Sequence, residues 1–264
     1  MATVIITHGG AADHINLQGL IRHFASIVPN ELIIMSQGNC EGLIAALYED
    51  LPNVIILTDR NMYPTLYEND TYLINVSDAK YLIRVGFYLF EYTYFTEQKK
   101  KSFVEAFYLS KNLDPSMRYT NFKIPQSIRE ESKKIYENFI EKFGNEYVLI
   151  HEDPNHSIIN GFKYGDNIRS NILPINKKFI RNDLPIINLD QISNKLIDYL
   201  DVLLNAKEIH VIHSSWSNLL HNLNFSEEKL KSIPIYIHFY CRDNKDYNLY
   251  EPSHNNWTYL KSDE

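Results

Sequence analysis

The feature that most constrains this fold is the alternation of short β-branched runs with longer segments of helical periodicity. Residues 3–7, 31–35 and 53–57 are compact apolar runs, and residues 13–27 and 40–48 between them carry apolar side chains at helical spacing. A helix between two short strands is typical of parallel strands, because antiparallel neighbours need only a tight turn. This first part of the chain therefore predicts a βαβαβ arrangement.

A second α/β series begins after a charged helix that we predict at residues 128–143. Two such series in one chain predict an α/β protein with two Rossmann-like lobes that face each other across a cleft. We expect the lobes to comprise residues 1–125 and 126–264, and we allow the C-terminal tail to pack back on the first lobe. The elements expected in the second series are strands at 147–150, 209–212 and 235–239 and helices at 189–204 and 215–223.

The stretch between the two series gives a weaker signal. Residues 63–119 are rich in aromatic side chains and show no sustained period. Core packing is the favoured explanation for these aromatic residues, and a surface that stacks on sugars is the alternative. We place no functional residues there.

Composition and charge exclude several classes of partner. Of 264 residues, 44% are hydrophobic and 22% charged, and the formal net charge is −7 at pH 7. This balance argues against nucleic acid or anionic lipid as a partner. No apolar run approaches the roughly 20 residues that span a bilayer, and the N-terminus lacks the basic lead of a signal peptide. Cys40 and Cys241 lack the paired spacing of a zinc site. We therefore expect a protein of the cytoplasm, either of a bacterium or of a virus-infected host.

Glycines and polar residues follow the first predicted strand, where α/β sheets bind their ligands. Gly9 and Gly10 allow a tight turn and a close approach of the backbone to a ligand. Asp13 and His14 follow as the first helix begins. Asp13 has two possible roles, a helix cap or a carboxylate directed at a ligand, and for an Asp in this position alone capping is favoured.

Polar residues also follow the strands of the second series. Here Ser214 or Ser215 suits an N-cap, and the same helix start, with its free amides and positive dipole end, suits a diphosphate. Arg242 adds a cation after the last of these strands. The candidate donor-binding residues are His151, Asp153, Ser214, Ser215, Trp216, Ser217, Asn218 and Arg242.

Several chemistries have no support in the sequence. It contains no phosphate-binding G-x-x-x-x-G-K loop, no G-x-G-x-x-G, no nucleophile elbow and no H-E-x-x-H. It also lacks an Asp-x-Asp pair to hold a metal-bound nucleotide sugar, and its histidines show no metal-ligand spacing. We therefore predict no metal and no cofactor.

Three segments resemble GT-B glycosyltransferases of the heptosyltransferase-like family and its uncharacterised bacterial and viral relatives. Residues 9–22 resemble the loop and first helix of their acceptor lobe, and residues 211–220 resemble the strand, turn and helix that bind the donor diphosphate. Residues 252–257 resemble the segment after their last strand. The chain departs from the family pattern at His213, where an acidic residue is usual, and near Ser215, where a glycine is usual.

The resemblance implies a glycosyltransferase that moves a sugar from a nucleotide sugar to a glycan or other hydroxyl acceptor. In that case Asp13 is the general base, and Gly9, Gly10 and His14 lie on the acceptor side. The residues from Ser214 to Asn218 hold the diphosphate, and His151 and Asp153 line the donor pocket. Displacement is then direct, inverting and independent of metal.

Two alternatives stay open at this point. One is a fucosyltransferase-like enzyme that uses a GDP-linked donor and arginine clamps. The other is a relative that binds nucleotide sugars or carbohydrates without turnover, because a fold does not fix a function.

Overall fold

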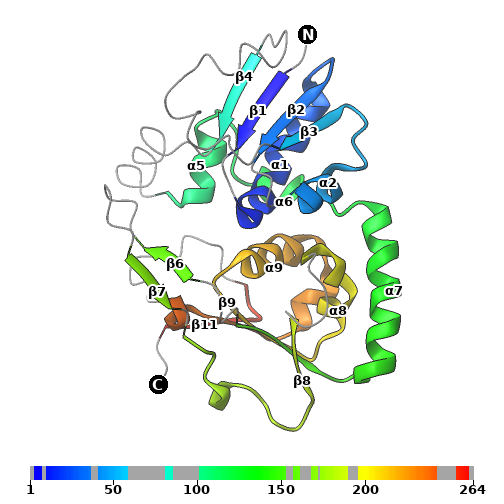
Figure 1. The fold of residues 1–264 in the computed structure, drawn as a ribbon, viewed down its shortest axis with the longest axis vertical. Coiled ribbons are helices and arrows are strands. Elements are labelled where there is room, and N and C mark those ends of the chain that lie inside the picture. Colours follow the sequence, from blue (N-terminus) through cyan, green and yellow to red (C-terminus); the bar gives the residue numbers. More distant parts are fainter. Residues whose placement is uncertain are drawn as a thin grey trace. The chain divides into compact units, whose positions relative to one another are not determined.

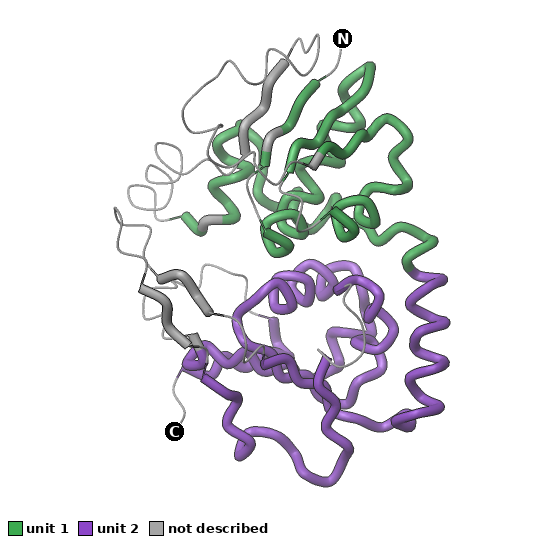
Figure 2. The backbone as a smooth tube through the Cα atoms, viewed as in Figure 1, with its two compact units in different colours: residues 1–128 green, residues 129–264 purple. Residues whose placement is uncertain are grey.

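The structure is a computed structural model that divides into two compact units, Met1–Ile128 (unit 1) and Arg129–Glu264 (unit 2), drawn in green and purple in Figure 2. The roles that we expect for two lobes, acceptor binding and donor binding, stay predictions. The structure describes residues 3–7, 10–36, 41–58, 81–85, 101–152, 157–160, 168–171, 173–189, 196–242 and 254–261.

Unit 1 contains a parallel sheet with the strand order β3-β2-β1-β4 (Figure 1). The central strands are apolar on both faces because parallel sheets are covered on both sides. This explains why the sequence showed uninterrupted apolar runs here rather than alternation. The strands are β1 (Thr3–Thr7), β2 (Leu32–Ser36), β3 (Val54–Thr58) and β4 (Tyr81–Val85).

The helices of unit 1 follow the predicted order in its first part. The first helix begins two residues earlier than expected, with Gly10 as its N-cap. Two further helices lie at the end of the aromatic-rich stretch, for which no element was predicted. The helices are α1 (Ala11–Ile27), α2 (Glu41–Tyr48), α5 (Phe103–Leu109) and α6 (Met117–Thr120).

Helix α1 is the centre of unit 1 and packs very closely against α6. A Cβ atom added at Gly19 would lie 2.1 Å from the carbonyl oxygen of Met117, so only glycine permits this approach. The buried Tyr108 hydroxyl of α5 donates to the Asn16 carbonyl at 2.7 Å and accepts the Leu20 N–H at 3.3 Å. Tyr108 is therefore a core residue. This agrees with core packing as the favoured explanation for the aromatic residues of 63–119.

Residues 18–22 of α1 include polar and charged side chains that bind to neighbouring segments. The two terminal guanidinium nitrogens of Arg22 contact the Asp50 carboxylate, at 2.7 and 3.1 Å, and the Lys123 ammonium lies 2.8 Å from the same carboxylate. Gln18 donates to the Lys123 carbonyl at 2.7 Å and accepts the Lys123 N–H at 2.8 Å. The segment after α6 is thereby held beside α1.

Unit 2 contains a second parallel sheet, with the strand order β11-β10-β9-β5-β8, and an antiparallel pair, β6 and β7. In the parallel sheet, β5, β9 and β10 were expected from the sequence, whereas β8 and β11 were not. The strands are β5 (Val148–His151), β6 (Ser157–Asn160), β7 (Ile168–Asn171), β8 (Ile186–Asn188), β9 (Glu208–Ile212), β10 (Ile235–His238) and β11 (Trp257–Leu260).

The helices of unit 2 include the charged helix that the sequence predicted, α7, which starts in the last residues of unit 1. Of the helix expected at 189–204, the described part consists of a 3₁₀ turn followed by a short α-helix. The α-helices are α7 (Gln126–Phe143), α8 (Leu200–Asn205) and α9 (Ser215–Ser226), and the 3₁₀ helices are η4 (Lys177–Phe179), η6 (Leu196–Tyr199), η7 (Glu228–Ser232) and η8 (Phe239–Arg242).

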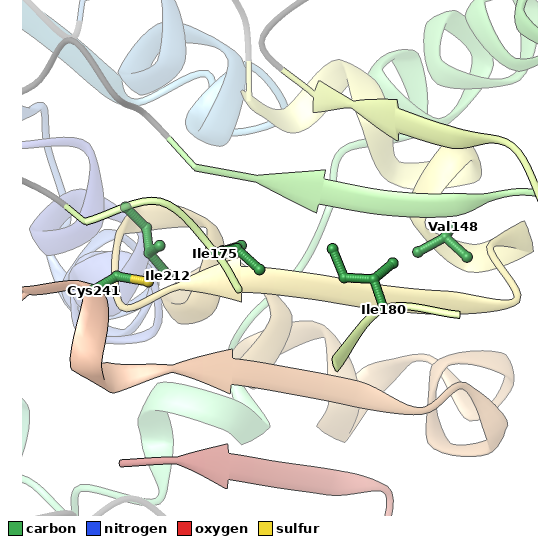
Figure 3. Packing of buried hydrophobic residues seen from close by; sticks show 5 residues of the cluster. All are labelled: Val148, Ile175, Ile180, Ile212 and Cys241. Carbon is green, nitrogen blue, oxygen red and sulfur yellow. The ribbon is translucent and has the colours of Figure 1, made fainter. Parts of the chain in front are cut away.

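The two faces of the unit 2 sheet have different covers. Val148 of β5 and Ile212 of β9 pack with Ile175 and Ile180, which come from the irregular segment before β8 (Figure 3). His151 lies three residues after Val148 and therefore on the opposite face, where it contacts α9. One face is thus covered by α9 and the other by a segment whose described regular structure is the 3₁₀ turn η4.

Candidate functional site

Asp13 occupies the third position of α1 rather than its N-cap. The chain enters α1 through Gly10, whose backbone is extended, with φ −76° and ψ −171°. The Asp13 carboxylate accepts the Gly10 N–H at 3.0 Å, and the Gly10 carbonyl accepts the N–H groups of Asp13 and His14 at 3.1 and 3.2 Å. Asp13 therefore satisfies one backbone donor at the start of the helix, as a carboxylate at this position does in a capping box.

The electrostatic setting of Asp13 differs from that of an ordinary surface carboxylate. Burial raises the pKa of Asp13 from 3.8 to about 6, and the hydrogen bond from the Gly10 N–H acts in the opposite direction. The side chain itself is half-buried. A carboxyl with a pKa close to neutral exchanges protons readily near the working pH, as a general base requires.

Gly10 and His14, two residues near Asp13 that were expected on the acceptor side, differ in their exposure. Gly10 is exposed, and a Cβ added there would meet no atom of the described residues within 4 Å. His14 is fully buried, and its Nε2 lies 3.0 Å from the Oγ1 of Thr7, the last residue of β1. His14 thus joins α1 to β1 from inside the core. Gly9, also expected on the acceptor side, lies outside the described residues.

Helix α9 begins with a complete capping box. The Ser214 hydroxyl accepts the Trp216 N–H at 3.2 Å and also the Ser217 N–H. The Ser217 hydroxyl accepts the Ser214 N–H at 3.0 Å and donates to the Ser214 carbonyl at 2.8 Å. The Asn218 side chain donates to the same carbonyl at 2.9 Å. These contacts leave the N–H of Ser215, the first residue of the helix, outside the cap.

Trp216 belongs to the core of unit 2. Its ring centroid lies 5.2 Å from that of Tyr199 and 5.8 Å from that of His151, and Trp216 is 5% exposed. The Tyr199 hydroxyl donates to the Leu189 carbonyl at 2.9 Å. The structure therefore brings His151 and Trp216 together, as expected for residues of one site. Trp216 is buried, however, so it supports the start of α9 from the core.

The accessible groups beside the start of α9 are half-buried side chains. His213 stacks on Phe239, with ring centroids 5.1 Å apart and an interplanar angle of 24°. Ser215 is likewise half-buried. Arg242 ends η8, and its backbone alone is described. Asp153 lies outside the described residues.

Sequence analysis missed a row of polar side chains on the face of the unit 2 sheet that is covered by the segment with η4. Glu208 and His210 of β9 lie beside His238 of β10 and Tyr240 of η8, joined by hydrogen bonds. Both histidines are fully buried. The signal that could have revealed this row is the spacing of two between polar residues in runs that are otherwise apolar, since such residues share one face of a strand.

The described residues also bear on metals and membranes. Across the described ranges, no three His, Cys, Asp or Glu side chains are grouped so that they could hold a metal ion. Within those same ranges, no helix combines the length and the apolar character needed to cross a bilayer.

Comparison with solved structures finds glycosyltransferases. The chain is similar to the bacterial iron-containing dodecameric glycosyltransferase TibC from enterotoxigenic E. coli H10407, with a TM-score of 0.50 and 13% identity over 90% of this chain and 57% of that one. It is also similar to the glycosyl transferase family 9 structure from Veillonella parvula DSM 2008, with a TM-score of 0.54 and 8% identity over 99% of this chain and 86% of that one. No protein-family model and no curated protein matches the sequence.

These likenesses concern the fold. They extend over both units, so each unit has its counterpart in a glycosyltransferase, and the predicted α/β class with two Rossmann-like parts is confirmed. The chain spans only 57% of the length of TibC. That the two lobes face each other across a cleft stays a prediction.

Proposed function

We propose that this protein is a glycosyltransferase that moves a sugar from a nucleotide sugar to a hydroxyl acceptor. The fold that it shares with two glycosyltransferases supports this proposal. The observation that carries it is the position of Asp13 in the first turn of α1, soon after β1 in the chain, where its half-buried carboxylate accepts the N–H of the exposed Gly10 and burial raises its pKa to about 6.

In the proposed reaction Asp13 acts on an acceptor held by unit 1. Its carboxylate removes the proton from the acceptor hydroxyl, and the hydroxyl oxygen attacks the anomeric carbon of the donor sugar. The bond between this carbon and the diphosphate oxygen breaks, and its electron pair leaves with the diphosphate. The configuration at the anomeric carbon is inverted, because attack and departure occur on opposite sides in one step.

The donor is proposed to bind to unit 2 at the start of α9. Helix starts attract anions through free N–H groups and the helix dipole. The Ser215 N–H is the group best suited to the diphosphate, since the cap already uses the N–H groups of Trp216 and Ser217. Ser214, Ser217 and Asn218 hold the turn in shape, His151 supports it through Trp216, and Arg242 and Asp153 remain proposed donor contacts.

We further propose that the leaving diphosphate is stabilised without a metal ion or another cofactor. Preorganised donors directed at developing charge can provide this stabilisation. The relationship to heptosyltransferase-like enzymes is part of the same proposal and rests on the sequence segments around Gly10 and Ser215.

A second candidate is a relative that binds nucleotide sugars without turnover. The observation that favours it is the capping box of α9, because the Ser214 hydroxyl occupies two of the N–H groups that a diphosphate would use. Such a protein would bind a nucleoside diphosphate but would transfer no sugar, with or without Asp13.

The proposal is tested by measuring the melting temperature of the full chain with ADP, GDP, UDP, CDP and dTDP. A ligand present at 100 times its dissociation constant adds about 2.7 kcal/mol to the free energy of unfolding. We expect one nucleotide to raise the melting temperature. The matching nucleotide sugar should then be hydrolysed, or its sugar transferred to an acceptor. Absence of a shift with every nucleotide would contradict the donor assignment.

A further inference from the structure

The strand order of the parallel sheet in unit 2 indicates where this sheet binds a ligand. In chain order its strands are β5, β8, β9, β10 and β11, and in the sheet β8 pairs with one side of β5 while β9 pairs with the other. The chain thus fills one side of β5 first and then continues on the opposite side. In open α/β sheets, ligands bind beyond the carboxyl ends of the two strands at such a reversal. The ends of β5 and β9 are therefore the expected position.

Glu152 and the start of α9 lie at these two strand ends. Glu152 directly follows β5, whose last residue, His151, pairs in register with Val211 of β9. Helix α9 begins at Ser215, three residues after β9 ends. The Glu152 carboxylate and the Ser215 N–H, which is the group proposed to bind the diphosphate, therefore belong to the ends of neighbouring strands.

The Glu152 carboxylate is held in place from one side. Its Oε1 accepts the Ile175 N–H at 3.0 Å, and the Glu152 side chain is half-buried. Ile175 is itself 3% exposed and packs with Ile212 and Cys241 (Figure 3). Among the described residues, no hydrogen bond involves Glu152 Oε2. The carboxylate is thus oriented by the protein and keeps one oxygen for a ligand.

The charge of Glu152 decides which part of a nucleotide sugar it can bind. A carboxylate accepts hydrogen bonds but cannot donate them, and it repels the negatively charged oxygens of a diphosphate. The groups of a nucleotide sugar that donate hydrogen bonds are its sugar hydroxyls and the N–H groups of its base. On the donor, Glu152 can therefore bind only a sugar or the base.

Leu173 and Pro174 offer an apolar surface at the same edge of the sheet. The Leu173 N–H donates to the carbonyl of Cys241, in the turn η8 directly after β10, at 2.8 Å. The Leu173 side chain is 51% exposed, and Pro174 is also exposed. Ligand sites combine apolar surface with a few placed polar groups, and an apolar surface suits the flat ring of a base. This assigns the base to Leu173 and Pro174 and leaves Glu152 for a sugar.

The apolar surface and the carboxylate are connected through one short segment. Ile175, which donates to Glu152, is two residues from Leu173, at most about 7 Å of extended chain. The Asn176 N–H, next in the chain, donates to the Tyr240 hydroxyl at 2.6 Å. Backbone hydrogen bonds therefore fix this segment on the sheet edge, with the apolar surface and the carboxylate within the length of one nucleoside.

We propose that Leu173, Pro174 and Glu152, which we call the nucleoside strip, bind the nucleoside half of the donor. The base packs on Leu173 and Pro174, and Glu152 Oε2 accepts a hydrogen bond from a ribose hydroxyl. The diphosphate lies at the start of α9, so this inference rests on the proposed function. The strip determines specificity, because it favours ligands that carry a ribose hydroxyl over those that lack it.

The first test uses calorimetry on the full chain with the nucleoside diphosphate that gives the largest rise in melting temperature. Its ribose, 2′-deoxyribose and 3′-deoxyribose forms are compared, with inorganic diphosphate as a probe that lacks the nucleoside. In the parent, we expect loss of one of the two hydroxyls to lower affinity about 10- to 100-fold, as for a hydrogen bond to a charged group. In Glu152→Gln, we expect this preference to fall to about threefold or less, with unchanged affinity for inorganic diphosphate.

Glu152→Gln has a built-in safeguard and a matched control. The Gln side-chain oxygen can still accept the Ile175 N–H, so the segment stays anchored. Glu146→Gln removes a carboxylate before β5, at the opposite edge of the sheet, where Glu146 pairs with Lys207 at 3.3 Å. We expect Glu146→Gln to keep the hydroxyl preference of the parent. An equal hydroxyl preference in the parent and in Glu152→Gln would overturn the role of Glu152.

The second test concerns the apolar part of the strip and needs no change at Glu152. Leu173→Ser should lower the affinity for the nucleoside diphosphate about 3- to 10-fold, through the lost burial of part of a leucine side chain, and leave that for inorganic diphosphate unchanged. Ile186→Ser is the control, since Ile186 is 41% exposed and begins β8, away from the carboxyl edge. We expect it to alter neither affinity.

The outcomes separate this inference from the proposed function. Unchanged nucleoside diphosphate affinity in Leu173→Ser, or an equal loss for inorganic diphosphate, would overturn the nucleoside strip and leave the diphosphate site at α9 intact. Absence of binding by every nucleoside diphosphate would contradict the proposed donor site itself, and the strip with it.

Discussion

The carboxylate of Asp13 accepts the backbone N–H of Gly10 at a distance of 3.0 Å. This contact fixes the carboxylate at the start of α1, soon after β1 in the chain. Among the described residues, no hydrogen bond involves the second carboxylate oxygen, which could therefore meet an acceptor hydroxyl. One side chain can therefore stabilise the helix start and serve as a base, and the two roles respond differently to substitution.

The raised pKa of Asp13 predicts that this residue makes the protein less stable as pH rises. The pKa of Asp13 is about 6 in the folded protein against 3.8 for an ordinary Asp. Folding therefore favours the protonated form, and this contribution to the free energy of unfolding is full below pH 4 and is lost as pH rises to about 6. We expect the parent to lose stability relative to Asp13→Asn over this range. Denaturant unfolding of both proteins at pH 4, 5, 6 and 7 measures the difference, and a constant difference would contradict the raised pKa.

Gly19 predicts a strong effect of one methyl group on the packing of α1 against α6. Gly19→Ala would place Cβ 2.1 Å from the Met117 carbonyl oxygen, which belongs to backbone and cannot turn aside. We expect a loss of about 1–3 kcal/mol in the free energy of unfolding, as for other overpacked sites. Gly42→Ala in α2 is the matched control, since its Cβ would meet no described atom within 4 Å. If both variants unfold at the same denaturant concentration, the close approach of α1 and α6 is wrong.

The donor proposal predicts different effects of two substitutions at Ser215. Proline suits the first position of a helix, so Ser215→Pro should leave α9 intact while it removes the N–H that the cap does not use. Ser214 before it is extended, with φ −154° and ψ −169°, as the residue before a proline requires. We expect nucleotide diphosphate affinity to fall about 10- to 100-fold, as for the loss of a hydrogen bond to a charged group. Ser215→Ala keeps the N–H and should bind nearly as the parent does in calorimetry. Unchanged affinity in Ser215→Pro would move the diphosphate elsewhere.

Metal independence predicts that turnover persists in excess EDTA. The proposed stabilisation of the leaving diphosphate uses a helix start and an arginine, and these need no cation. The measurement is the transfer rate before and after dialysis against EDTA, with and without added Mg²⁺ or Mn²⁺. A strict requirement for either cation would contradict the proposed chemistry.

The sequence predicted those elements whose apolar pattern is long or uninterrupted. The expected range 3–7 coincides with β1, and β2 differs from its expected range by one residue at each end, because central parallel strands are apolar throughout. By contrast, β8 has three residues and α6 has four, too few for a period to appear. The strand β4 follows a stretch without clear pattern.

The sequence predicted the candidate site best where a residue type has a known role in local structure, such as serine at a helix N-cap. Ser214 was one of two expected N-caps of α9, and the structure assigns the cap to it. The burial of Trp216 could not be predicted, since its partners Tyr199 and His151 are remote in sequence. The same holds for Glu208 and His238, which come together only through the register of β9 and β10. Pairing across strands requires the register, and the register is not readable from one sequence.

The central claim is that Asp13 is the general base of a sugar transfer, and Asp13→Asn tests it most directly. The Asn side-chain oxygen can still accept the Gly10 N–H, so the helix start is kept, but it cannot take up a proton at neutral pH. The measurement is the transfer rate of this variant beside the parent, with nucleotide diphosphate affinity as the control. The account predicts a rate lower by about 10²- to 10⁴-fold with unchanged nucleotide affinity. A transfer rate equal to that of the parent would contradict it and leave Asp13 as part of the helix start alone.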